Sequence, residues 1–89
     1  MYRVYVEDKT IWNGEEIGAS PERIASTFFP GFTAVKAVGY WHGKAEQSVV
    51  IEVDTNDRTK VYEMAKELKI RLGQESVLVI YLPSTSELV

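Results

Sequence analysis

The chain has 89 residues, of which 45% are hydrophobic and 26% are charged, as is typical of one small globular domain. Its net charge of −3 at pH 7 argues against duplex nucleic acid as a partner, because proteins that bind it neutralise many phosphates. The absence of cysteine excludes disulfides and thiolate catalysis, and no apolar run is long enough to cross a bilayer. We therefore expect residues 1–89 to form a single cytoplasmic domain without membrane contact.

The first part of the chain predicts a strand, a tight turn and a helix. Apolar and polar side chains alternate over residues 2–7, which is the period of a half-buried strand. Asn13 and Gly14 form the dipeptide best suited to a short hairpin turn. Ser20-Pro21-Glu22 combines an N-cap hydroxyl, a first-turn proline and an acid at the positive end of the helix dipole. A helix is therefore expected from this motif to Pro30-Gly31.

The rest of the chain predicts two strands, a long helix and a last strand. Residues 32–42 and 47–53 are rich in β-branched and aromatic side chains, so they are expected to be strands joined by a hairpin. Polar N-cap residues at 54–57 precede apolar side chains at helical spacing, and Gly73 is a natural helix-ending residue. Residues 77–82 form a continuous apolar run that predicts the last strand.

The order βαββαβ predicts an α+β ferredoxin-like plait, in which one antiparallel four-stranded sheet carries two helices on one face. We expect Val4, Ile51 and Ile80 to point at the helices. Strand alternation then sends a mixed aromatic, apolar and charged set to the open face: Arg3, Tyr5, Lys36, Tyr40, Val50, Glu52, Val79 and Tyr81. A face of this kind marks a ligand or partner surface, which predicts a cleft, a sheet-to-sheet homodimer or higher oligomer, or both.

The hairpin motif Gly39-Tyr40-Trp41-His42-Gly43-Lys44-Ala45-Glu46-Gln47-Ser48 gathers rings, donors and acceptors that suit a small ligand. His42 is the only histidine, and a lone histidine is more often a surface residue than a catalyst or metal ligand. Lys44 and Glu46 either orient a polar ligand or keep the tip soluble. Trp41 more often packs under such a hairpin than stacks on a ligand.

Residues outside the hairpin complete the predicted site. Gln74 and Glu75 open the last strand, where they either cap the sheet or join Glu46 in a shared site. Trp12 lies beside a turn with little core around it, which favours a contact role. The predicted ligand-binding residues are Arg3, Tyr5, Trp12, Tyr40, His42, Lys44, Glu46, Gln74, Glu75 and Tyr81. No cofactor, metal ligand or catalytic residue is assigned.

Four segments resemble, in the same order, a bacterial family called domain of unknown function 3574. They are Phe29-Pro30-Gly31-Phe32-Thr33, Gly39-Tyr40-Trp41, Glu46-Gln47-Ser48 and Leu72-Gly73-Gln74-Glu75-Ser76-Val77-Leu78. The similarity covers roughly the C-terminal two thirds and extends to short phage-encoded proteins of like pattern. It implies the plait and a site that pairs Glu46 with Gln74 and Glu75, and it implies no reaction.

Three functions remain open at this point. The first is a non-catalytic, homo-oligomeric protein that binds a small polar or nucleotide-like ligand; a phage-encoded chain would sequester a signal in the host cytoplasm. The second is a small dimeric enzyme of the isomerase or cofactor-free oxygenase type, with His42 or Glu46 as general base. The third is an inhibitor module that blocks a protein partner through the open sheet face.

Overall fold

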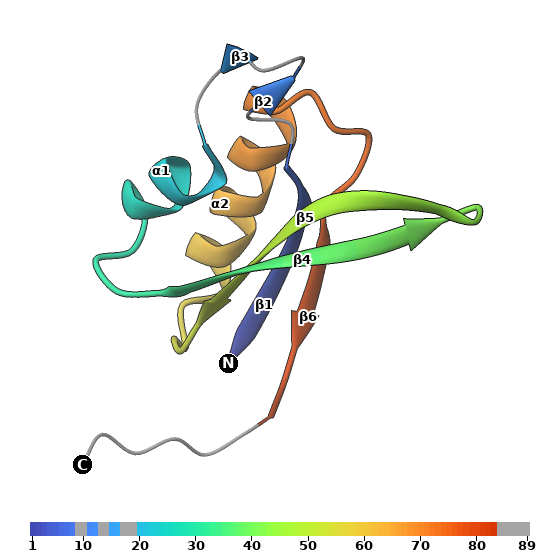
Figure 1. Cartoon of the computed structure of the whole chain (residues 1–89). Coiled ribbons are helices and arrows are strands. Elements are labelled where there is room, and N and C mark those ends of the chain that lie inside the picture. The colour runs from blue at the N-terminus through green and yellow to red at the C-terminus, as the bar shows by residue number, and fades with distance from the viewer. Residues whose placement is uncertain (9–10, 13–14, 17–19, 84–89) are drawn as a thin grey trace.

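The computed structural model describes residues 1–8, 11–12, 15–16 and 20–83, which form one main sheet, two helices and a minor strand pair (Figure 1). The main sheet has the order β4-β5-β1-β6, and each neighbouring pair is antiparallel. Its strands are β1 (Tyr2–Glu7), β4 (Thr33–Trp41), β5 (Lys44–Val53) and β6 (Leu78–Tyr81). The minor pair consists of β2 (Ile11–Trp12) and β3 (Glu15–Glu16). The predicted α+β class, with an open four-stranded antiparallel sheet and two helices, is confirmed.

The first helix, α1 (Pro21–Ser26), begins as predicted and ends earlier than predicted. The Ser20 hydroxyl accepts a hydrogen bond from the Arg23 amide at 3.2 Å, and Pro21 occupies the first turn. At the other end, the Ser26 and Thr27 hydroxyls each donate to a carbonyl three residues back, at 2.6 Å. Because these hydroxyls bond with the last helical carbonyls, the helix ends at Ser26, before Pro30-Gly31.

The second helix, α2 (Arg58–Arg71), has the two ends that the sequence predicts. The Asp57 carboxylate accepts from the Lys60 amide at 3.0 Å. Gly73 has a positive φ of 63°, and the Gln74 amide donates back to the Lys69 carbonyl at 2.9 Å. This backward bond past a left-handed glycine is the Schellman motif, which satisfies the carbonyls that a helix end leaves open. None of the helices in the described ranges is long and apolar enough to span a bilayer.

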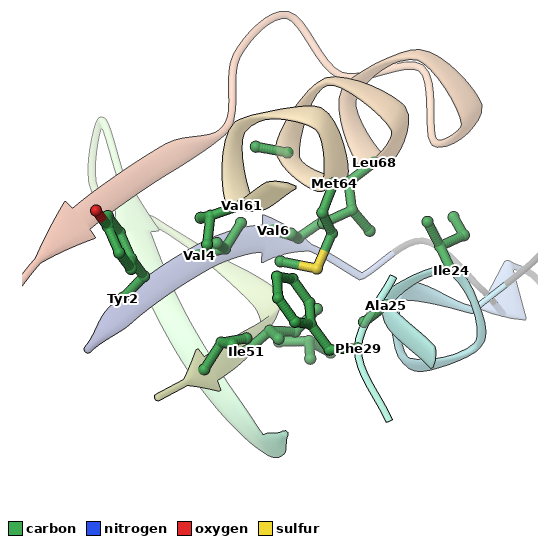
Figure 2. Close-up of a cluster of buried hydrophobic side chains, with 13 residues drawn as sticks. Tyr2, Val4, Val6, Ile24, Ala25, Phe29, Ile51, Val61, Met64 and Leu68 are labelled. Carbon is green, nitrogen blue, oxygen red and sulfur yellow. The ribbon is translucent and has the colours of Figure 1, made fainter. Parts of the chain in front are cut away.

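Both helices pack on the same face of the sheet, over the two central strands β1 and β5 (Figure 2). The buried cluster consists of Tyr2, Val4, Val6, Ile24, Ala25, Phe29, Val49, Ile51, Val53, Val61, Met64, Ala65 and Leu68. Alternate strand residues contribute to it, so the residues between them lie on the open face. Removing this apolar surface from water is the main stabilising contribution of the fold.

The register of β6 corrects the prediction for the last strand. Tyr81 pairs with Tyr2 and Ile80 pairs with Arg3, so Val79 and Tyr81 lie on the helix face and Ile80 lies on the open face. Residues 77–82 are apolar at nearly every position, so the sequence carries no alternation that could set their phase. The pairing with β1 sets it instead.

The register of β4 corrects a second part of the same prediction. Lys36 pairs with Val49 and Tyr40 pairs with Ala45, which places both on the helix side of the sheet instead of the open face. Only the start of β4 lies beside the body of the protein, because β1 pairs with β5 from Ser48 onwards. The remainder of β4 and β5 forms a two-stranded arm that projects from the sheet (Figure 1).

The tip of this arm is tighter than predicted. His42 and Gly43 both have positive φ, at 50° and 75°, and they alone separate β4 from β5. Two left-handed residues in a row make a type I′ turn, whose twist matches that of the strands. Lys44 and Glu46 therefore belong to a strand, where the sequence predicted a longer connecting loop.

Replacement of Leu68 by alanine should lower the free energy of unfolding by about 2–5 kcal/mol, because it empties a fully buried position between α2 and the sheet. Urea denaturation followed by circular dichroism measures the loss. Ile70→Ala is the matched control: Ile70 lies on the same helix with 66% of its surface exposed, so its loss should stay within about 0.5 kcal/mol. Equal losses at the two positions would contradict the observed packing of α2.

Candidate functional site

A groove lies between α2 and β6, on the helix face of the sheet. Beside the start of α2 it contains a cavity of about 450 Å³, lined by Tyr2, Thr55, Asn56, Arg58, Tyr62 and Tyr81. A second cavity of about 600 Å³ continues along the helix and is lined by Tyr62, Ala65, Lys66, Lys69, Ser76, Val77 and Val79. Tyr62 borders both cavities. We call the two together the α2–β6 groove.

The spacing along α2 explains why basic side chains line one wall of this groove. Arg58, Tyr62, Lys66 and Lys69 lie within a quarter turn of one another at 100° per residue. This stripe runs beside the stripe of Val61, Met64, Ala65 and Leu68 that enters the core. The polar stripe is consequently held against the edge of the sheet instead of facing away from it.

The aromatic side chains of the groove come from three separate elements. Tyr2 of β1 is buried, and its ring lies 5.1 Å from that of Tyr81 of β6 at a tilt of 51°. Tyr81 keeps 60% of its surface exposed, so its ring is open to a ligand. The Arg58 guanidinium lies over the Tyr62 ring, 5.2 Å from its centre. This cation–π contact holds the guanidinium against a ring that also lines the cavity.

The charge of the groove is opposite to that of the whole chain. Arg58, Lys66 and Lys69 line it, and the acid Glu63 appears only in an adjoining hollow of about 370 Å³ shared with Arg58, Tyr62 and Lys66. The amide of Asn56 and the hydroxyl of Thr55 add neutral donors and acceptors. Such a lining suits an anion that also carries a ring. No group of three potential metal-ligating side chains occurs in the part of the chain that the structure describes.

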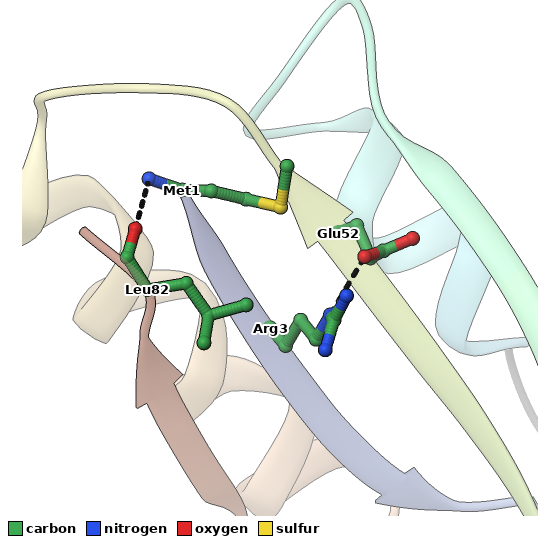
Figure 3. Close-up of polar contacts among 4 residues, drawn as sticks. All are labelled: Met1, Arg3, Glu52 and Leu82. Atoms are coloured by element: carbon green, nitrogen blue, oxygen red, sulfur yellow. Dashed lines mark hydrogen bonds and ion pairs between the residues drawn. The ribbon is translucent and has the colours of Figure 1, made fainter. Parts of the chain in front are cut away.

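Arg3 and Tyr5, two of the predicted ligand residues, lie on the open face of the sheet, as the sequence predicted. The Arg3 Nε donates to Glu52 Oε2 at 2.7 Å across β1 and β5 (Figure 3). This hydrogen bond is the main cause that raises the pKa of Arg3, and the neighbouring Tyr5 adds to it. Figure 3 also shows the Met1 amino group donating to the Leu82 carbonyl at 3.2 Å, beside the edge of β6.

The sequence predicted one common sheet face for Arg3, Tyr5, Tyr40 and Tyr81, and the strand register contradicts this prediction. Tyr81 belongs to the helix face and the α2–β6 groove, as the β6 register requires. Tyr40, His42, Lys44 and Glu46 lie on the projecting arm, where Tyr40 is largely exposed. The arm and the groove involve different strands of the sheet, and none of these four arm residues lines the cavity beside Tyr81.

Gln74 has a structural contact that accounts for its position. The Glu7 amide donates to Gln74 Oε1 at 3.2 Å, and Gln74 Nε2 donates to the Glu7 carbonyl. The side-chain amide thus continues the pairing of β1 beyond the start of β6. In the described residues, no contact joins Gln74 or Glu75 to Glu46, which pairs with Gly39 in the arm.

The two tryptophans are described only through their backbones. Trp12 pairs with Glu15 in the minor strand pair, and Trp41 pairs with Lys44 at the end of the arm. The predictions of a contact role for the Trp12 ring and of a packing role for the Trp41 ring concern side chains outside the described part of the structure.

Sequence reasoning missed most of the groove, namely Tyr2, Thr55, Asn56, Arg58 and Tyr62. A usable pattern existed on α2, where arginine, tyrosine and two lysines recur at helical spacing beside the apolar stripe. Tyr2 and Tyr81 could not be added to it without the strand register. No family model, curated protein or solved structure matches the chain.

Replacement of Gln74 by alanine should destabilise the fold by about 1–3 kcal/mol, because it leaves the half-buried Glu7 backbone amide and carbonyl without these bonds. Urea denaturation measures the effect. Gln47→Ala, which removes an exposed glutamine side chain from β5, should change stability by no more than about 0.5 kcal/mol. A Gln74→Ala protein as stable as the unmodified chain would show that this amide is not a sheet cap.

Proposed function

We propose that the protein binds a small ligand with a negatively charged group and a planar ring, such as a nucleotide, in the α2–β6 groove. It holds the ligand without converting it and thereby sequesters it. The observation that carries this proposal is the joint lining of one cavity by three tyrosines and Arg58. Rings supply a surface for stacking and the guanidinium supplies directional bonds to phosphate oxygens.

The dimensions of the groove support this ligand class. Cavities that hold small molecules are typically about 300–1,000 Å³, and the tyrosine-lined part alone measures about 450 Å³. The exposed ring of Tyr81 lines the cavity, and Arg58 lies over the Tyr62 ring in the same lining. Lys66 and Lys69 extend the positive charge along the helix, which suits a ligand with more than one phosphate.

The proposal keeps the ligand class expected from the sequence and moves its location. Of the residues predicted for ligand binding, Tyr81 lines the groove, while Arg3 and Tyr5 lie on the opposite face. We further propose that the fold is of the ferredoxin-like class. Support comes from the order β4-β5-β1-β6, in which the first strand lies between the two strands that flank α2 in the chain. Sequestration would take place in the cytoplasm, the compartment favoured by a cysteine-free chain.

Isothermal titration calorimetry with ATP, adenosine and tripolyphosphate tests the binding proposal. ATP should bind more tightly than either of the other two compounds, because only ATP presents both a ring and a phosphate chain. Arg58→Ala should weaken ATP binding by roughly tenfold or more, through the loss of charge-assisted hydrogen bonds. Tyr81→Ala should weaken adenosine and ATP and leave tripolyphosphate unchanged.

Matched controls separate groove binding from general charge or ring effects. Arg71→Ala removes an exposed arginine from another side of the same helix, and Tyr40→Ala removes an exposed tyrosine from the arm. Both should bind ATP like the unmodified chain. If none of the three compounds binds, or if Arg71→Ala weakens binding as much as Arg58→Ala, the proposed site is wrong.

A further inference from the structure

The open face of the sheet carries side chains in ordered rows that run across all four strands. The register places Val35, Val50, Tyr5 and Leu78 side by side on β4, β5, β1 and β6. We call these four residues the apolar row. The next row towards the start of β1 consists of Thr33, Glu52, Arg3 and Ile80, and we call it the charged row.

The apolar row is a continuous hydrophobic band that neither helix of the described chain covers. Leu78 and Val35, at its two ends, have 58% and 45% of their surfaces exposed, and Tyr5 and Val50 between them are half-buried. Both helices lie on the other side of the sheet, so neither can cover this band. Exposed apolar bands of this kind mark interaction surfaces in soluble proteins.

In both rows the side chains change character at the boundary between β5 and β1: their size changes in the apolar row and their charge changes in the charged row. In the apolar row the β4 and β5 side is small, with two valines, and the β1 and β6 side is large, with tyrosine and leucine. In the charged row the β5 position is the acid Glu52, and the β1 position is the base Arg3. If a second copy is placed on this face by a two-fold axis along the boundary, the β4 and β5 half of one copy lies over the β1 and β6 half of the other.

We propose that the open face binds a second copy of this chain, related by a two-fold axis that runs parallel to the strands between β5 and β1. Large side chains then oppose small ones, with Tyr5 over Val50 and Leu78 over Val35 of the other copy. In the charged row, Arg3 of each copy lies over Glu52 of the other. One symmetry operation thus gives complementary shape and complementary charge, as a self-matching interface requires.

The Arg3–Glu52 ion pair within each chain supports a second copy of the chain as the partner. The pair is already formed within one chain at 2.7 Å, and the two side chains remain 40% and 25% exposed. Stacking two copies brings two such pairs together in an alternating square of charges. Each charge then has two opposite neighbours, an arrangement more favourable than two separate surface pairs. Sheets that pack face to face stay within about 30° of alignment, which the proposed axis allows.

The association itself is tested by sedimentation velocity over a concentration series. The unmodified chain should sediment as a dimer, and Leu78→Arg or Val35→Arg should shift it to a monomer, with at least about tenfold weaker association. Ile70→Arg is the matched control, because it places the same charge at an exposed aliphatic position on α2, and it should remain dimeric. Circular dichroism verifies that each variant is folded. A chain that is monomeric up to about 1 mM, as expected if the face serves another partner, would overturn the proposal.

A charge-exchange experiment tests the symmetry. Arg3→Glu and Glu52→Arg should each weaken self-association, because the charged row then carries like charges that face each other in the dimer. An equimolar mixture of the two should form a heterodimer, since every charge then opposes its opposite across the axis. Failure of the mixture to associate more strongly than either variant alone would rule out the proposed two-fold axis. ATP binding by the same variants is a separate readout, because the groove lies on the other face.

Discussion

The antiparallel pairing of β1 with both of its neighbours is the interaction on which the other features of this protein depend. It directs Tyr2, Val4 and Val6 into the core, where both helices cover them. The same register brings Tyr81 against Tyr2 on the helix face and Glu52 beside Arg3 on the open face. A slip of one residue would reverse these assignments, because side chains alternate between the faces of a sheet. The α2–β6 groove and the open face that we propose for self-association therefore follow from one register.

Local features of the sequence predicted the elements well. The Ser20-Pro21 start of α1 and the Gly73 end of α2 depend on residues close together in the chain, and the structure has both. The end of α1 was predicted too late, because the hydroxyls of Ser26 and Thr27 bond with its last carbonyls ahead of the proline. The two-residue turn at the tip of the arm also escaped prediction, since a residue other than glycine seldom adopts the positive φ that His42 has here.

The candidate site could not be predicted from the sequence to the same degree. Its walls come from β1, α2 and β6, and only long-range pairing tells which side chains of these elements face one another. The apolar stretch before Leu82 gives no alternation, and β4 has valines on both of its faces. Sequence analysis therefore placed Tyr81 and Tyr40 with Arg3, and the pairing of β6 and β4 with their neighbours separates them. The sequence shows which residue types are present, and the strand register decides which of them lie together.

The central position of β1 has a consequence for the order of folding. The arm formed by β4 and β5 needs only a two-residue turn, so its contacts are local and close rapidly. The pairing of β1 with β6 joins segments more than 70 residues apart, as between Tyr5 and Leu78. Closing so long a loop has a larger entropic cost, which places this pairing late. Until β6 docks, β1 has an unpaired edge, the state in which such a sheet is most exposed to aggregation.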